Sequence, residues 1–271
     1  MWGEVTPAER LRAVTRRHVD EDRLAAEAAD ALAGFAHEPA SLVVACRRVL
    51  AHHRSFGPLW WVCARILAAA DPGLGAYEAM RLLEGDRTAD RLGATLPLLD
   101  EDQVVAVVGW PEAVDLALIE RLDIAVVALR LEGADPAPAL RRRVSDRGVR
   151  IVDPWDPTLT DVARFLVPAS AIGPERCLVP LGTGDALDVL GNAVREVWVI
   201  GGVGRILPAR LYDVMLRETF GPHEFEDEPA IEELSLERVD CIAGPRGVQR
   251  AHDAATRSDC PVVPELLRPI D

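Results

Sequence analysis

The first 95 residues carry apolar positions at the spacing of amphipathic helices. Residues 42–53 illustrate this pattern, since Leu42, Cys46, Val49 and Leu50 fall on one helical face. From Pro58 the chain is almost wholly apolar for twelve residues, which predicts a helix buried in a core or a subunit interface. We predict helices that begin at Thr6-Pro7 and that span 20–35, 42–53, 58–70 and 76–92.

From residue 103 the pattern changes to short apolar segments that alternate with helices. The run 104–110 is continuous and β-branched, which is typical of a strand covered on both faces. The predicted strands are 104–110, 124–130, 149–153, 165–170 and 196–202, and the predicted helices are 112–122, 136–147, 158–165, 184–194 and 208–218. Right-handed crossovers then give a doubly wound, mainly parallel, Rossmann-like sheet.

The end of the chain alternates less regularly. Residues 231–244 predict one or two late strands, and a final helix follows them. The acidic stretch 223–233 is expected to be a solvated loop. The chain therefore divides into a helical N-terminal domain, 1–98, and a Rossmann-like α/β domain, 99–271.

The amino-acid composition excludes several kinds of catalytic and binding site. All 30 cationic residues are arginine, so a lysine Schiff base and the lysine of a Walker phosphate loop are excluded. The net charge of −14 disfavours nucleic-acid binding and adhesion to anionic membranes. No apolar run is long enough to span a membrane, and the charged N-terminus does not resemble a signal peptide. Five cysteines without a CxxC pair indicate reduced thiols in a cytoplasmic protein, without a zinc site.

Ligands of open parallel sheets bind beyond the carboxyl ends of the strands. The residues at the predicted ends are Gly109, Trp110, Arg130, Asp153, Ser170, Gly201 and Gly202. These positions are candidates for a binding site, and the alternative is that they are ordinary loop residues.

Two glycine-containing segments could bind an anion. In the first, 181–185, backbone N–H groups at a helix N-terminus would face the anion, although Thr183 and Asp185 also suit simple helix capping. The second, 201–205, follows a strand but lacks the full dinucleotide motif because position 207 is leucine. We therefore expect no nicotinamide or other cofactor, and we keep Arg205 as an anion ligand.

The order and spacing of several segments resemble one superfamily over roughly residues 20–218. It comprises the regulatory subunits (alpha, beta and delta) of eukaryotic translation initiation factor 2B, methylthioribose-1-phosphate isomerase and ribose-1,5-bisphosphate isomerase. The segments that carry the resemblance are 53–59, 105–114, 129–133, 146–149, 166–173 and 181–183. The resemblance implies the two-domain fold and a phosphate-binding pocket, closed by the helical domain and lined by Arg54, Arg130 and the Gly182–Thr183 backbone.

The same resemblance implies a loss of catalysis. The isomerases' cysteine acid/base falls near Gly109-Trp110, their aspartate falls at Ser170, and their Asn-Lys pair falls at Val179-Pro180. Serine is a poor general base unless another group activates it.

We therefore interpret the chain as a catalytically degenerate, cytoplasmic, homodimeric relative of these isomerases that binds a phosphorylated sugar or nucleotide. The predicted ligand-binding residues are Arg54, Ser55, Gly109, Trp110, Arg130, Gly182, Thr183, Gly202 and Arg205. One alternative is an active enzyme that uses Asp153, Ser170, Asp185 or Asp188 as acid or base, or Cys177 as nucleophile. The other alternative is a regulatory subunit that acts by binding another protein.

Overall fold

We describe the fold from a computed structural model, over residues 9, 11–12, 21–119, 121–142, 148–221 and 230–268. The helix predicted at Thr6-Pro7 lies outside these residues, except for Glu9, Leu11 and Arg12, which are helical. The chain forms two compact units. The helical unit comprises Met1–Asp86, Val203–Glu226 and Arg257–Asp271, and the sheet unit comprises Arg87–Gly202 and Asp227–Thr256. The domain boundary at residue 98 stays a prediction, because compactness does not show which segments fold independently.

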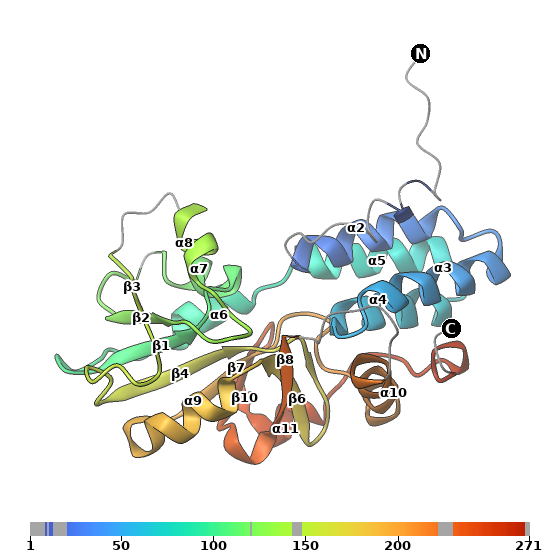
Figure 1. The fold of residues 1–271 in the computed structure, drawn as a ribbon. Helices are drawn as coiled ribbons and strands as arrows, with labels where there is room; N and C mark the ends of the chain where they lie inside the picture. Colours follow the sequence, from blue (N-terminus) through green and yellow to red (C-terminus); the bar gives the residue numbers. More distant parts are fainter. Residues whose placement is uncertain are drawn as a thin grey trace. The chain divides into compact units, whose positions relative to one another are not determined.

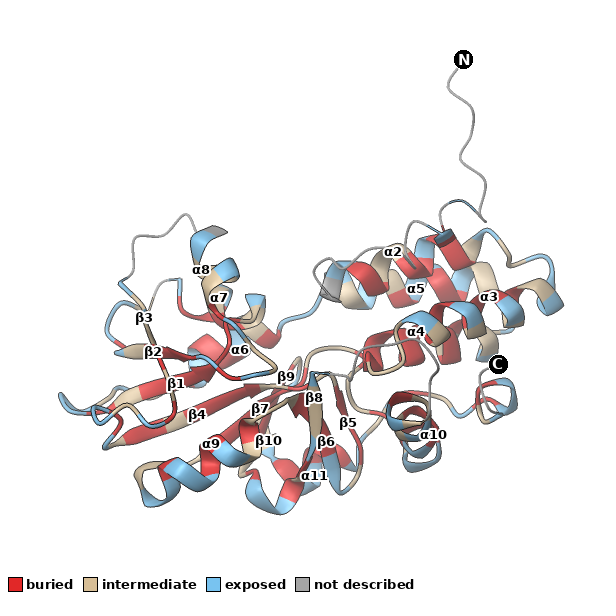
Figure 2. Ribbon diagram, viewed as in Figure 1, coloured by how far each residue is buried: buried red, intermediate tan, exposed pale blue. Residues whose placement is uncertain are grey.

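The helical unit contains α2 (Glu21–Ala33), α3 (Pro39–His52), α4 (Gly57–Ala68), α5 (Pro72–Glu84) and α10 (Ala209–Phe220) (Figure 1). Helix α4 forms its core, as the nearly continuous apolar pattern predicts. Trp60 and Trp61 are fully buried, and Figure 2 shows α4 mostly in the colour of buried residues. The two tryptophans therefore contribute to the core of their own unit and offer no surface to a second subunit.

The helix predicted over 76–92 is wrong in its boundaries. The chain instead forms α5 and, after a break at Gly85-Asp86, α6 (Thr88–Thr95). Asp71 is the N-cap of α5, where its carboxylate accepts hydrogen bonds from the N–H groups of Gly73 and Leu74 at 2.9 and 3.1 Å. The Asp-Pro-Gly sequence thus begins a helix, with proline in the first turn, as well as ending the previous one.

The sheet unit is built on a seven-stranded sheet in the order β10-β9-β7-β4-β1-β2-β3. Its strands are β1 (Val104–Val108), β2 (Val126–Leu129), β3 (Arg150–Val152), β4 (Val162–Pro168), β7 (Val197–Ile200), β9 (Cys241–Gly244) and β10 (Gly247–Arg250). All neighbours are parallel except β9 and β10. The doubly wound, mainly parallel sheet predicted from the sequence is confirmed.

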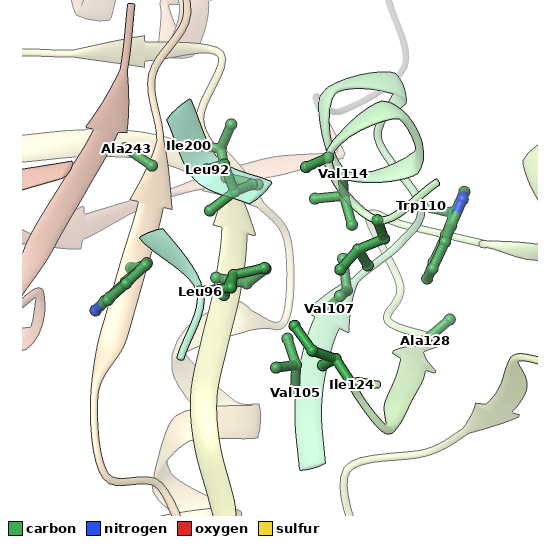
Figure 3. Close-up of a cluster of buried hydrophobic side chains, with 14 residues drawn as sticks. Leu92, Leu96, Val105, Val107, Trp110, Val114, Ile124, Ala128, Ile200 and Ala243 are labelled. Atoms are coloured by element: carbon green, nitrogen blue, oxygen red, sulfur yellow. The ribbon is translucent and has the colours of Figure 1, made fainter. Parts of the chain in front are cut away.

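Helices cover the sheet on both faces. Figure 1 shows α7 (Glu112–Ala117) on one face and α9 (Thr183–Leu190) on the other. Helix α8 (Ala137–Arg142) connects β2 to β3, and α11 (Ala251–Ala255) is the predicted final helix. Between α6, α7 and the sheet lies a core cluster that includes Leu92, Leu96, Val105, Val107 and Val114 (Figure 3). The continuous apolar runs of β1 and β7 reflect burial on both faces.

The helix predicted over 158–165 is wrong. Thr158 lies in a turn where its N–H donates to the Asp156 carboxylate at 2.9 Å, and β4 already begins at Val162. The N–H of Val104 donates to the carbonyl of Asp161 at 3.1 Å, so pairing with β1 outweighs any local helical preference.

A second sheet was not predicted. Strands β5 (Ala171–Ile172) and β6 (Arg176–Pro180) form an antiparallel sheet with β8 (Ile231–Ser235). The described end of the acidic stretch 223–233 therefore belongs to a strand, which corrects its assignment as a loop; residues 222–229 lie outside the described part. The one or two late strands predicted over 231–244 are confirmed as β8 and β9.

Candidate functional site

The sheet unit has a topological switch point between β1 and β4. From β1 the strand order runs through β2 to β3, and from β4 it runs through β7 to β9 in the opposite direction. Ligands of doubly wound sheets bind outside the carboxyl ends of the strands at such a point. Gly109 follows β1 at this edge, and its N–H donates to the carbonyl of Leu129 at 3.0 Å.

Three predicted segments meet at this edge. A Cβ atom at Gly109 would lie 3.2 Å from the Cβ of Ala134, and one at Gly182 would lie 3.7 Å from the Cβ of Leu131. Gly133 links the two loops most closely, because its N–H donates to the carbonyl of Leu181 at 3.0 Å. We call the combination of Gly109, the turn 130–134 and the loop 181–183 the strand-end junction.

Gly133 can occupy this position because it has no side chain. A Cβ atom there would collide with the carbonyl oxygen of Ala230 and the backbone nitrogen of Leu181. The close approach of two backbones therefore requires glycine.

The loop 181–183 leads into α9. Gly182 is the N-cap residue with φ of +89°, a left-handed conformation that suits glycine. Thr183 is fully buried, and its hydroxyl donates to the carbonyl of Pro180 at 2.6 Å. The N–H of Gly184 donates to the carboxylate of Glu232 at 2.6 Å, so an acid of this chain already caps the helix.

Arg130 directly follows β2 and begins the turn 130–134 of the strand-end junction. Its side chain is about half exposed, and its Nε lies 3.8 Å from the carboxylate of Asp135. An exposed ion pair this long contributes little stability, so the guanidinium can exchange that partner for a ligand anion at small cost.

Trp110 also follows β1, but it lies in the core. Its side chain is 6% exposed, and its indole N–H donates to the Asp115 carboxylate at 3.0 Å. The ring packs within the cluster of Figure 3. Trp110 thus contributes to the core beside β1, and the only polar atom of its side chain already has an acceptor.

The candidate catalytic side chains do not form hydrogen bonds with one another. Among the described residues, Asp153, Ser170, Cys177 and Asp185 share no side-chain hydrogen bond with one another, and Asp188 pairs with Arg238 at 2.6 Å. Asp185 is exposed in the first turn of α9, whereas Ser170 uses its N–H to bond the carbonyl of Leu178. This arrangement offers no preformed acid–base pair.

Cys177 is fully buried in β6. Its thiol donates to the carbonyl of Leu234 at 3.7 Å, and burial raises its pKa to about 12. Because the thiolate is the nucleophile, such a thiol is unreactive near neutral pH.

Arg54, Ser55 and Arg205 belong to the helical unit, where two segments come together at the start of α4. The guanidinium of Arg205 stacks over the ring of Phe56, with its Cζ 5.4 Å from the ring centroid. A Cβ atom at Gly204 would lie 3.2 Å from atoms of Pro58 and Trp61. The loop 203–205 therefore packs on the segment that begins with Arg54 and Ser55, whereas Gly202 ends the adjoining segment of the sheet unit.

Sequence reasoning missed two charged residues of the sheet unit. Glu232 caps α9, and Arg238 donates to the carbonyl of Gly184 at 3.3 Å as well as to Asp188. Local pattern gave no indication of either role, because Glu232 and Gly184 are 48 residues apart. The alternating pattern over residues 231–244 indicated a strand there, but not the partner of Glu232.

The described residues contain neither a metal-binding cluster nor a membrane-spanning helix. No group of three or more His, Cys, Asp or Glu side chains is arranged to hold a metal ion. No helix in that part of the chain is both long and apolar enough to cross a membrane.

No family model matches the chain, and no curated protein matches it. Several solved structures, in contrast, match the chain. Translation initiation factor eIF-2B from Pyrococcus horikoshii OT3 superposes with a TM-score of 0.70 at 15% identity, over 92% of this chain and 98% of that one.

Two further solved structures superpose on this chain. The eIF2B beta subunit from Chaetomium thermophilum gives a TM-score of 0.62 at 14% identity, over 96% of this chain and 92% of its own. 5-Methylthioribose 1-phosphate isomerase from Pyrococcus horikoshii OT3 gives 0.61 at 13% identity, over 92% and 86%. The chain has the fold shared by initiation factor 2B subunits and methylthioribose-1-phosphate isomerase, which confirms the resemblance predicted from its sequence.

Proposed function

We propose that the chain binds a phosphorylated small molecule, a sugar phosphate or a nucleotide, and does not isomerise it. The observation that carries this proposal is the convergence of Gly109, the turn 130–134 and the loop 181–183 at the switch point of the sheet. Arg130 supplies a cation at that edge. In a chain without lysine, arginine and backbone N–H groups are the natural ligands of a phosphate.

The absence of isomerisation rests on the residues that replace the isomerases' reactive groups. Trp110 stands near the position of the cysteine, and its indole N–H is bonded to Asp115. Ser170 replaces the aspartate, and Pro180 replaces the lysine. None of these side chains can exchange a proton with a sugar carbon near neutral pH.

Within the helical unit, Arg54, Ser55 and Arg205 stay proposed anion ligands. Arg54 and Ser55 directly precede α4, and Arg205 is held near them by its stacking on Phe56. Two arginines near a helix N-terminus favour an anion.

The same proposal includes a cytoplasmic homodimer. All five cysteines are free thiols, and four of them are buried, which suits a reducing compartment. One structural neighbour is a tetrameric eIF2B beta and delta complex from C. thermophilum, superposing at a TM-score of 0.65 and 16% identity over 92% of each chain. Exposed apolar side chains beside α7 are the surface we assign to self-association, namely Leu98, Leu116, Ile119 and Leu122.

A thermal-shift screen against sugar phosphates and nucleotides tests the binding proposal. A ligand at 100 times its Kd stabilises the folded state by about 2.7 kcal/mol, which corresponds to a shift of roughly 5–10 °C for a chain of this size. Arg54→Ala and Arg130→Ala should each abolish the shift. Arg81→Ala, at an exposed position of α5, and Arg176→Ala, in the exposed pair with Glu233, should retain it. Equal shifts in all four variants would disprove the assigned ligands.

A working enzyme built on other residues is the second candidate. Asp153 after β3 and Asp185 in the first turn of α9 remain candidates for acid or base, whereas the buried thiol of Cys177 argues against a nucleophile there. Turnover of any compound in the screen, lost in Asp153→Asn or Asp185→Asn, would favour this candidate. A stable complex with a different protein, isolated at full length, would instead favour a regulatory subunit.

A further inference from the structure

The loop after β3 carries an exposed tryptophan. Trp155 is 72% exposed, whereas the other four tryptophans of the described residues are at most 6% exposed. Between residues 123 and 188, no other large apolar side chain in the described part of the chain is comparably exposed. A single flat ring among polar neighbours suits one small planar ligand, because a protein partner needs a contiguous apolar patch.

Hydrogen bonds hold the turn that presents Trp155. The carbonyl of Asp153 accepts a bond from the N–H of Asp156 at 3.0 Å, which places Trp155 at the third position of a β-turn. The Asp156 carboxylate accepts a bond from the N–H of Thr158 at 2.9 Å. Arg150 of β3 donates to the hydroxyl of Thr158 at 3.2 Å, which ties the returning chain to the strand. A ring on such a turn loses little conformational freedom when a ligand stacks on it.

This turn begins beside Arg130 at the carboxyl end of the sheet. Strands β2 and β3 are parallel neighbours with Leu129 opposite Val152, and the N–H of Arg130 donates to the carbonyl of Val152 at 3.0 Å. Arg130 and Asp153 are therefore the first residues beyond two adjacent strands, and Trp155 follows two residues later. Because adjacent strands lie about 4.8 Å apart, the backbone segments that carry the guanidinium and the indole are close enough for one small ligand to contact both.

We propose that Trp155 stacks on the base of a nucleotide, so that the ligand of the strand-end junction is a nucleotide and not a simple sugar phosphate. The assignment rests on the proposed function, in which Arg130 binds the phosphate. In a nucleoside monophosphate the ribose separates the phosphate from the base, so a phosphate bound after β2 allows the base to reach the turn after β3. Trp155 then determines the specificity of the site, because stacking of a base on an aromatic ring increases affinity by about five-fold or more.

Calorimetric titrations with adenosine 5′-monophosphate and ribose 5-phosphate test this assignment, because the two compounds share the ribose and the phosphate and differ in the base. The wild type should bind the nucleotide at least about five-fold more tightly than the sugar phosphate. Trp155→Ala should weaken binding of the nucleotide alone and bring the two affinities together. Trp155→Phe keeps an aromatic ring and should retain most of the difference. Tyr77→Ala is the matched control, because it removes an exposed aromatic ring from the helical unit and should change neither affinity.

Tryptophan fluorescence supplies a readout that a merely structural role of Trp155 would not change. The nucleotide should quench the emission of the wild type, and ribose 5-phosphate should not. Trp155→Phe should still bind the nucleotide but should lose this quenching.

Equal affinities of the wild type for the two compounds would overturn the stacking role, while Arg130-dependent binding of both would leave the proposed function standing. An equal loss of affinity for both compounds in Trp155→Ala would also overturn the role of Trp155 in base recognition. Failure of both compounds to bind the wild type would contradict the proposed function itself, and the assignment of Trp155 with it.

Discussion

The N–H of Gly133 donates a hydrogen bond to the carbonyl oxygen of Leu181 at 3.0 Å, which ties the turn after β2 to the loop that opens α9. These segments are far apart in the sequence, and neither belongs to the strands of the large sheet. Their contact brings the segments of Arg130 and Gly182 together at the edge where we propose that the ligand binds.

Gly133→Ala should disrupt this contact. The new methyl group would collide with backbone atoms of Ala230 and Leu181, which cannot move as a flexible side chain would. Overpacking of this kind costs about 1–3 kcal/mol or more. Urea denaturation should show the loss, and Gly148→Ala is the control because a Cβ atom there meets nothing within 4 Å. Equal stability of the two variants would contradict the assigned contact.

Arg121 should stabilise the end of α6. Its guanidinium donates to the carbonyls of Gly93 and Leu96 at 2.7 and 2.8 Å, besides its pairing with Asp123. Hydrogen bonds from a charged donor contribute about 1.5–3 kcal/mol each when partly buried. Arg121→Ala should therefore lower the free energy of unfolding by at least ~1.5 kcal/mol.

Arg87→Ala is the comparison for this loss. Arg87 forms only an exposed pair with Asp90 at 3.3 Å, and exposed pairs contribute about 0–1 kcal/mol. If both arginines proved equally dispensable, Arg121 would have no role in holding the helix end.

Cys177 should make stability fall at high pH. Its pKa in the folded protein is about 12, raised by burial from a usual value near 9.0. Above the usual value the unfolded chain loses the thiol proton while the folded chain retains it, so unfolding is favoured increasingly up to about pH 12. Cys177→Ala should reduce the decline in Tm, relative to its own value at pH 8, between pH 9 and 11. A parallel decline in both proteins would show that Cys177 is not the group responsible.

The surface beside α7 should mediate self-association. Leu116 and Ile119 are 52% and 59% exposed, and Leu122 and Leu98 are 79% and 83% exposed. Arg121 holds the segments that carry them together. Sedimentation should show a dimer for the wild type and a monomer for Ile119→Glu. A monomeric wild type, or a variant that remains dimeric, would contradict this surface assignment.

The large sheet could be predicted because several of its strands are continuous apolar runs rich in β-branched residues, which is a local signal. Residues 104–108 and 197–200 show this clearly. The small sheet could not, since β5 has two residues and exists only through its pairing with β6. The start of α5 at Pro72, ahead of the predicted residue 76, depended on reading Asp71 as an N-cap, which its proline neighbour obscured.

The candidate site also combines features with a local sequence signal and features that depend on long-range contacts. The positions of Gly109 and Arg130 at strand ends were predictable because strand ends can be located from the apolar runs that precede them, and their role as ligands stays a prediction. The role of Glu232 depends on the register of β8 with β6 and on a contact across 48 residues, which no local pattern encodes. Likewise, the burial of Trp110 results from its packing in a cluster that also contains distant residues such as Leu92 and Ile124.

The most direct test of the account is a 31P NMR measurement on the protein mixed in equal amounts with aldose 1-phosphates, including 5-methylthioribose 1-phosphate, and with nucleotides. The account predicts that at least one phosphorus signal broadens with the wild type, that Arg130→Ala removes the broadening, and that no new phosphate signal appears with time. A signal from an isomerised product, or no broadening by any compound, would contradict a phosphate-binding protein that has lost its catalytic groups.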